Sequence, residues 1–279
     1  MIKTEKIGEI RKFCMARSIL GRGWYFSASY WVDGLVVDTG CAHTVKELLS
    51  ALEGLRVSCI VNTHSHEDHI GGNARLQAGY GVNIFAHPLA LPVLEAPKER
   101  QPLYLFQRML FGYPDPSQGV ALGETLETDN YRFEVIPCPG HSPDHICLYE
   151  PERGWLFTGD AYVGGLDRVL RRDYDIWGII SSLKRIAGLD VELLFGGSGS
   201  IHVRPRAEIL RKIDYLEELG ARVLALHRKG AGCREIHRRL FERESLVAYL
   251  SQGYMSGKNL VRSYIFNKGR HNGFDMDSF

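Results

Sequence analysis

The segment His64-Ser-His-Glu-Asp-His69 places three histidines and two carboxylates within six consecutive positions. Neutral imidazoles combined with a carboxylate suit zinc, iron or manganese, whereas calcium and magnesium prefer shells made of oxygen. Residues 57–61, directly before it, form a short β-branched run that predicts a buried strand. An uncompensated polar cluster beside such a strand would lose its hydration without return. We therefore predict a metal site formed by His64, His66, Asp68 and His69.

These ligands would lie on a loop at the end of a strand. Side chains on a loop can converge without the i, i+4 spacing that a helix imposes. The spacing His-x-His-x-Asp-His resembles the signature of the metallo-β-lactamase superfamily, as do the preceding Thr63 and the following Gly71-Gly72. Later landmarks follow the family's order over roughly residues 20–205. The resemblance implies an α/β (α+β) fold, a four-layer αβ/βα sandwich with a one- or two-metal site at one edge of its two sheets. It does not separate the glyoxalase II-like branch from the lactonase-like branch.

Two further ligands are implied by the resemblance. His141 stands in a Gly-His-Ser context after a predicted strand at residues 131–136, where the family has the third imidazole of its first metal site. Asp160 ends Thr-Gly-Asp after a predicted hairpin, where the family has a carboxylate that bridges two metals. His145 resembles a position that orients the loop by hydrogen bonds without binding metal.

The last expected ligand departs from the family pattern. The chain reads Gly196-Gly-Ser-Gly-Ser200, and Ser198 occupies the position at which the family usually has histidine. Either His202 reaches the second metal from four residues downstream, or that site has only Asp68, His69 and Asp160 with water; both alternatives are open. The complete set of predicted ligands is His64, His66, Asp68, His69, His141, Asp160 and His202.

Several elements must position these residues. Residues 24–38 predict two strands joined at Asp33-Gly34, a dipeptide suited to the positive φ angles of a tight hairpin turn. We interpret Asp38 as part of a turn that caps a helix at residues 43–52. His43 is interpreted as a surface residue, and His87 as the start of a turn.

Two features are candidates for substrate contact. Residues 97–122 mix Pro and Gly with aromatics and predict a loop or broken helix, which forms either a wall of a substrate pocket or an ordinary packed connection. Tyr162, two residues after Asp160, would donate to a developing oxyanion or pack as a buried aromatic. We favour packing for Tyr162.

Composition sets the broad class. The 279 residues are 44% hydrophobic with a net charge of +1, so the chain can bury a large core and has no global field that favours nucleic acid or membrane. The six cysteines are scattered without a paired framework and are predicted to be reduced thiols. The first residues carry charge where a signal peptide needs an apolar core, which predicts a cytoplasmic protein.

The predicted domains are a metallo-β-lactamase-like domain at residues 1–205 and a C-terminal helical extension at 206–279. Helices are predicted at 206–228, 233–241, 244–250 and 258–266. Residues 204–243 contain eleven Lys or Arg and six Asp or Glu. This basic surplus would bind an anionic tail, such as that of glutathione or a coenzyme carrier, or nucleic acid; the favoured alternative is a solvated cap or a homodimer interface.

The ligand set predicts a hydrolase with two divalent metal ions. Zinc is the expected metal, with iron or manganese as alternatives. A metal-bound hydroxide would attack an ester, thioester or lactone carbonyl of a small-molecule substrate. Asp68 is the predicted catalytic residue, because it would both bind metal and orient the nucleophile. Two other functions are open: an iron-dependent oxidoreductase or dioxygenase acting on a sulfur compound, and a metal-binding protein that has lost catalysis through the change at Ser198.

Overall fold

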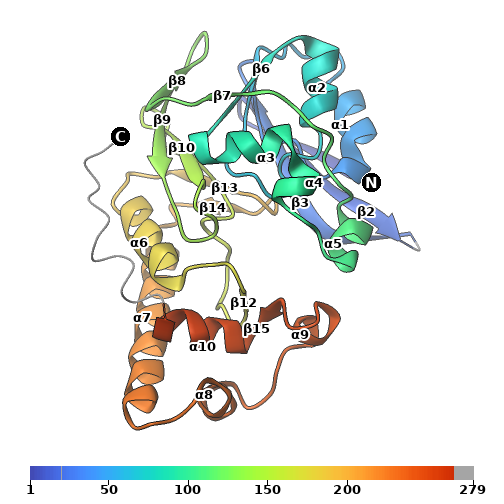
Figure 1. Ribbon diagram of the computed structural model, residues 1–279. Coiled ribbons are helices and arrows are strands. Elements are labelled where there is room, and N and C mark those ends of the chain that lie inside the picture. The colour runs from blue at the N-terminus through green and yellow to red at the C-terminus, as the bar shows by residue number, and fades with distance from the viewer. Residues whose placement is uncertain (20, 267–279) are drawn as a thin grey trace. The chain divides into compact units, whose positions relative to one another are not determined.

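The computed structural model describes residues 1–19 and 21–266 (Figure 1). These residues form two compact units. Unit 1 contains Met1–Pro137, Pro143–Val163 and Asp190–Pro205, and unit 2 contains Cys138–Ser142, Gly164–Leu189 and the described residues from Arg206 to Phe266. One boundary lies between Pro205 and Arg206, where the sequence predicts the start of the helical extension. Residues 267–279 of that predicted extension lie outside the described residues.

The first sheet of unit 1 has seven strands in the spatial order β1 to β7. They are β1 (Ile2–Ile7), β2 (Ile10–Ile19), β3 (Arg22–Val32), β4 (Leu35–Val37), β5 (Cys59–Val61), β6 (Asn83–Ala86) and β7 (Gly119–Ala121). Strands β1 to β4 are antiparallel neighbours, and β4 to β7 are parallel. The loops after β4 and β5 therefore start at the same edge of the sheet, where ligand sites of such sheets form.

The hairpin between β3 and β4 has the predicted turn. Asp33 and Gly34 both have positive φ, 49° and 87°. These angles match the twist of the flanking strands, and Gly34 adopts such an angle without a steric penalty. The predicted hairpin is thus confirmed, and it delivers the chain to β4 and the loop that follows.

The second sheet of unit 1 has six strands in the order β14-β13-β11-β10-β9-β8. They are β8 (Thr125–Glu127), β9 (Arg132–Pro137), β10 (Ile146–Glu150), β11 (Trp155–Gly159), β13 (Leu193–Gly196) and β14 (Ile201–Val203). Strands β10 and β11 form the predicted hairpin, and β11 pairs in parallel with β13. The segments after β11 and β13 consequently leave the sheet side by side.

The two sheets pack face to face around an aromatic core. Alternate residues of a strand point to opposite faces, so Leu35 and Val37 of β4 face the second sheet while Val36 faces away. The rings of Phe157 and Phe195 stack with centroids 4.9 Å apart, and Tyr30 of β3 meets both rings edge-on. This core fixes the strand ends from which the candidate ligands project.

Helices cover the outer face of the first sheet. The helical segments of unit 1 are η1 (Ala42–Thr44), α1 (Val45–Leu52), α2 (Asn73–Tyr80), η2 (Pro88–Ala90), α3 (Leu91–Glu95), α4 (Pro97–Arg100) and α5 (Leu105–Leu110). Leu48, Leu52 and Leu76 pack there with Ile60 and Ile84, and all five are fully buried. Residues 97–122 hold α4, α5 and β7. Of the two predicted alternatives, a loop or a broken helix, the structure has the broken helix, and the end of the segment adds a strand to the sheet.

Unit 2 is mainly helical. It contains α6 (Ile176–Ala187), α7 (Arg206–Arg228), α8 (Cys233–Phe241), α9 (Leu246–Leu250) and α10 (Gly257–Phe266), with the short strands β12 (Leu170–Arg171) and β15 (Met255–Ser256). The Tyr264 hydroxyl donates to the Leu216 carbonyl at 2.7 Å, and the Trp177 indole donates to the Tyr264 carbonyl at 3.2 Å. Tyr264 thereby ties α10 to α7 and α6.

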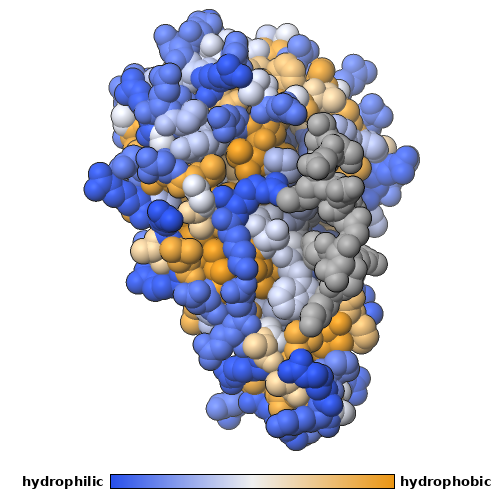
Figure 2. Space-filling model, turned by 90° about the vertical axis from the view of Figure 1, so that its left-hand side faces the viewer, coloured by the Kyte–Doolittle hydropathy of each residue, from blue (hydrophilic) through white to orange (hydrophobic). Residues whose placement is uncertain are grey.

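The surface is mixed in character. On the face seen in Figure 2, hydrophilic residues cover much of the area and hydrophobic residues are exposed in separate places between them. Within the described residues, none of the helices has the combination of length and apolar character that crossing a membrane requires.

Candidate metal centre

The histidine-rich loop follows β5 and is held at both ends by buried side chains. Asn62 and Asn73 exchange amide hydrogen bonds of 2.7 and 3.2 Å, and the Thr39 hydroxyl donates to Asn73 Oδ1 at 2.8 Å. A Cβ atom at Gly71 would lie only 2.3 Å from the backbone nitrogen of Ala42. The loop therefore packs directly on the segment after β4, and no larger residue fits at Gly71.

Asp38, the first residue after β4, holds the histidine-rich loop by hydrogen bonds to Thr63 and His69. Its Oδ1 accepts from the Thr63 backbone N–H at 2.8 Å, and its Oδ2 accepts from the Thr63 hydroxyl at 2.7 Å. Oδ2 also lies 2.7 Å from His69 Nδ1. The interpretation of Asp38 as a helix cap is therefore wrong. Its carboxylate is almost fully buried and accepts hydrogen bonds from residues of the metal loop.

These bonds determine which ring nitrogens carry protons. His69 Nδ1 donates to the Asp38 carboxylate, so its Nε2 is the nitrogen available to a metal. The Thr63 hydroxyl has one proton, which goes to Asp38, and so it accepts from His64 Nδ1 at 3.0 Å. His64 Nε2 is then also free of a proton. Asp38 thus sets the tautomers of two predicted ligands, one directly and one through Thr63.

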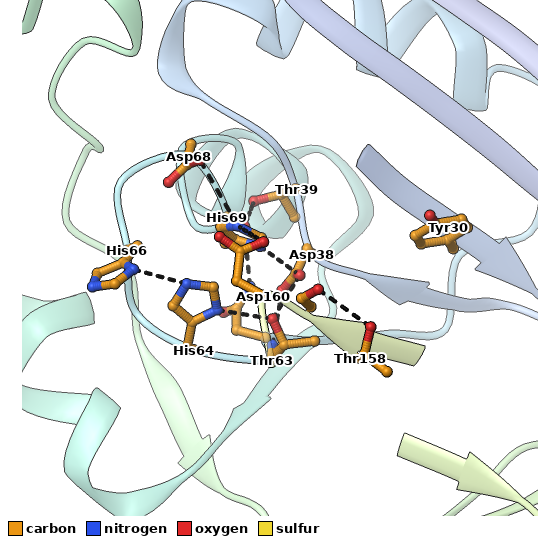
Figure 3. Close-up of polar contacts among 12 residues, drawn as sticks. Tyr30, Asp38, Thr39, Thr63, His64, His66, Asp68, His69, Thr158 and Asp160 are labelled. Atoms are coloured by element: carbon orange, nitrogen blue, oxygen red, sulfur yellow. Dashed lines mark hydrogen bonds and ion pairs between the residues drawn. The ribbon is translucent and has the colours of Figure 1, made fainter. Parts of the chain in front are cut away.

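Figure 3 shows a ring nitrogen of His64 facing a ring nitrogen of His66. His64 Nε2 lies 2.9 Å from His66 Nδ1, and both side chains are buried. Two ligands at zinc–nitrogen distances of roughly 2.0–2.1 Å in tetrahedral geometry stand about 3.3 Å apart. The observed distance of 2.9 Å is slightly shorter, as expected for two imidazoles that are hydrogen-bonded to each other without a metal between them.

A second group of donors lies beside the first. The ligand atoms of His64, His69 and Asp160 all lie within 4.8 Å of one another. His69 Nε2 is 3.6 Å from Asp160 Oδ1 and 3.8 Å from Asp68 Oδ2, distances that a shared cation would span. The residues present therefore fit a divalent metal ion at the edge of unit 1 (Figure 3).

The pKa shifts of Asp68 and His69 also indicate that a cation would stabilise this group of donors. Burial raises the pKa of Asp68 to about 7, and the Glu67 and Asp160 carboxylates act in the same direction although His69 opposes them. Burial alone would lower the pKa of His69, but the Asp38, Asp160 and Asp68 carboxylates outweigh it and raise that pKa well above its usual value. Metal binding would replace the His69 proton and relieve the crowding of negative charge.

His145 holds the backbone of Asp160 by a hydrogen bond. Its Nε2 accepts from the Asp160 backbone N–H at 3.1 Å, and its ring stacks on His64 with centroids 4.7 Å apart. Burial lowers the pKa of His145 to about 4, which keeps this acceptor unprotonated near neutral pH. The contacts agree with the predicted orienting role of His145.

The remaining predicted residues lie on other segments of the chain. His141 belongs to unit 2, where the Tyr174 hydroxyl lies 3.0 Å from its Nε2. His202 lies on β14 opposite Leu194 of β13, with its ring edge-on to Tyr162 at 5.2 Å. Tyr162 is buried, as its predicted packing role requires. The roles of His141 and His202 as ligands stay predictions.

Sequence reasoning missed some supporting residues. Asp144 accepts from the Ser65 backbone N–H at 2.8 Å, and Gln107 of α5 donates to Glu67 Oε1 at 2.6 Å. Both partners come from distant parts of the chain, so no local motif marks them. His87 accepts from Leu89 N–H at the start of η2, as its predicted turn position requires.

The chain can now be assigned to a class of proteins. Residues 22–198 match the metallo-beta-lactamase superfamily, and the chain belongs to that superfamily. Its fold is similar to that of a metallo-beta-lactamase family protein from Thermus thermophilus, with a TM-score of 0.66, 20% identity, and coverage of 91% of each chain. The predicted family and fold class are confirmed.

Three individual proteins of known name or structure are similar to this chain. The hydroxyacylglutathione hydrolase GloC of Haemophilus influenzae is 31% identical over 186 residues, which cover 60% of this chain and 81% of the relative. An atrochrysone carboxyl ACP thioesterase of Aspergillus fumigatus is 27% identical over 198 residues, 69% of this chain and 55% of the relative. The chain thus spans only about half of that thioesterase. TTHA1623, solved in a di-iron-bound form, is 28% identical with a TM-score of 0.54, and the match covers 68% of this chain and 96% of that one.

Proposed function

We propose that the protein is a metal-dependent hydrolase that cleaves an ester, thioester or lactone bond in a small molecule. The observation that carries this proposal is the arrangement set by Asp38, which makes the Nε2 atoms of His64 and His69 the nitrogens available to a metal beside Asp68 and Asp160. Such a donor set suits a catalytic divalent ion. The similarity to hydrolases and thioesterases supports the same reaction class.

The proposed ligands are divided between two ions. His64 and His66, with the predicted third imidazole His141, would hold the first ion. Asp68, His69 and Asp160 would hold the second, with Asp160 shared between both. When bound, these ions supply Lewis acidity, which polarises a carbonyl and lowers the pKa of water.

The side chains of this chain have their own tasks in the reaction. Asp38 keeps the His69 ring in one orientation, and His145 holds the backbone of Asp160. Asp68 is the proposed catalytic residue, since its buried carboxylate can accept a proton from the attacking water and return it to the leaving group. Gln107 holds the Glu67 carboxylate, and with it this part of the metal loop, by its 2.6 Å hydrogen bond.

A thioester is the substrate class that the relatives favour. Both named relatives act, by their names, on thioester-type bonds: hydroxyacylglutathione in one and an acyl carrier protein adduct in the other. The basic surplus of residues 204–243 would suit the anionic tail of such a substrate. Zinc is the proposed metal; the di-iron form of TTHA1623 keeps iron as the alternative.

Metal analysis and a substrate panel test the proposal. Purified protein should contain divalent metal and hydrolyse glutathione or coenzyme A thioesters, with a chelator abolishing turnover. Lactones and simple esters in the same panel define the branch. Oxygen consumption with a sulfur compound by an iron-loaded sample would replace hydrolysis by the redox alternative, and full metal occupancy without turnover of any substrate would favour the binding-only alternative. A cytoplasmic location and a homodimer stay predictions.

A further inference from the structure

The loop that carries Ser198 is held to the first sheet by its backbone. Tyr30 Oη donates to the Gly196 carbonyl at 2.5 Å, and the Ala28 N–H donates to the Gly197 carbonyl at 2.7 Å. Lys12 Nζ donates to the Gly199 carbonyl at 3.2 Å. The Gly197 N–H donates to the Gly159 carbonyl at 2.7 Å, which ties the loop to the residue before Asp160. Each of these bonds limits how far the loop can move.

The same loop passes directly against the second group of ligands. A Cβ atom placed on Gly197 would lie 2.4 Å from Asp160 Oδ1 and 2.8 Å from the His69 ring. The backbone therefore runs as close to these two ligands as an amino acid without a side chain allows. Ser198 is the next residue; it is exposed, and its side chain carries a hydroxyl and no imidazole.

His202 lies in a different structural setting. It is a residue of β14 and pairs with Leu194 across the antiparallel ladder. A move to the metal group would break the β13–β14 pairing, and the loop that would have to fold back is fixed at Gly196, Gly197 and Gly199. Among the described residues, the group of donors around His69 and Asp160 does not include His202.

From this geometry we propose that the second metal site has three protein ligands, Asp68, His69 and Asp160, and one position that the protein leaves open beside Ser198. The inference rests on the proposed function and its metal centre, and deepens both. The two ions then bind unequally: the ion at His64 and His66 stays bound, and the ion at His69 exchanges with solvent metal. The open position is available to water or to a donor atom of the substrate, such as a thiolate or carboxylate oxygen.

Zinc titration of the metal-free protein tests this inference without reference to turnover. Binding measured in competition with a chromophoric chelator should resolve one tight and one weaker equivalent. Ser198→His places an imidazole beside Gly197 and should tighten the weaker equivalent by more than about tenfold, the lower range for the loss of an outer-shell partner. Ser198→Leu adds a side chain of similar size without a donor nitrogen, and should leave the weaker site unchanged or weaker.

Each result of these titrations either supports or overturns the three-ligand second site. Two equally tight equivalents in the wild type would overturn the inference, as would loss of the second equivalent in His202→Ala, which would make His202 the missing ligand. Should Ser198→His fail to fold, Ser198→Cys offers a thiolate donor at the same place, and no gain in affinity there would equally count against the open position. Unequal zinc binding in a protein that hydrolyses nothing would leave this inference standing and overturn the proposed function.

Discussion

Replacing Asp38 with Asn reverses the protons on two predicted ligands. The Asn amide oxygen can still accept from the Thr63 N–H, but its NH₂ group would face His69 Nδ1 and the Thr63 hydroxyl. His69 Nδ1 must then accept, which puts its proton on Nε2. The Thr63 hydroxyl must turn to donate to His64 Nδ1, which puts the His64 proton on Nε2 as well.

The expected magnitude follows from these contacts. Loss of an outer-shell partner costs about 10–100-fold in metal affinity, or roughly 1.4–2.7 kcal/mol. Because Asp38 serves one ligand of each proposed ion, we expect a loss in this range at both. The free energy of unfolding of the metal-free protein should fall by about 2 kcal/mol, since the bonds lost are charge-assisted and buried.

Zinc competition titration and denaturant unfolding check both numbers. Asp33→Asn is the matched control: Asp33 also has positive φ, 49° against 58° at Asp38, and also accepts a backbone N–H, but it lies in the β3–β4 turn. Asn tolerates this conformation well, so backbone strain is equal in the two variants. Wild-type zinc affinity in Asp38→Asn, or an equal loss in Asp33→Asn, would refute the proposed control of tautomers.

Three further predictions concern neighbouring residues. His66→Ala should lose about one metal equivalent and nearly all turnover, measured by elemental analysis and thioester assay; full metal content would contradict its role as a ligand. Asp160→Asn should keep the fold and weaken zinc binding, because an amide carries no charge to offset a cation; unchanged melting together with unchanged zinc affinity would exclude the bridge. In the metal-free protein, His145 should contribute a loss of stability as the pH drops from about 6.5, the ordinary pKa of histidine, to about 4, the pKa of buried His145, because the unfolded chain takes up that proton first. Asp68, with its pKa raised to about 7, acts in the opposite direction over the same range. Denaturant unfolding at several pH values should therefore show that His145→Gln gains stability relative to the wild type as the pH drops; a constant difference between the two proteins would mean that His145 does not titrate in this range.

Elements with a strong local pattern could be predicted closely from the sequence. The helices Arg206–Arg228 and Cys233–Phe241 have the predicted bounds. These segments carry their own hydrophobic period and end signals, so neighbours do not need to define them. By contrast, β1 and β2 had no prediction, because β1 is charged and mostly exposed and is held as a strand by its pairing with β2.

The site residues also differ in how well the sequence predicts them. The ligand cluster from His64 to His69 is visible because its residues are adjacent, and the histidine-rich loop indeed follows a buried strand. Asp38 was misjudged because its partners lie 25 and 31 positions away, while its own neighbours resemble a helix start. A carboxylate directly after a buried parallel strand is a signal that could have found it, since such strand ends meet at one edge.

The charges around His69 are kept together by the hydrogen bonds and close packing of the surrounding structure. Asp38, Asp68 and Asp160 lie close to His69, and burial makes their mutual repulsion costly when no cation is present. A flexible loop would relieve that repulsion by opening to water, and the ligand geometry would be lost. The asparagine pair below the loop, the Gly71 contact with Ala42 and the fixed backbone at Gly197 all oppose such opening. The fold thus holds carboxylates and imidazoles in an arrangement that a divalent ion would stabilise, and the open position that we propose lies where hydrogen bonds at Gly196, Gly197 and Gly199 hold the backbone in place.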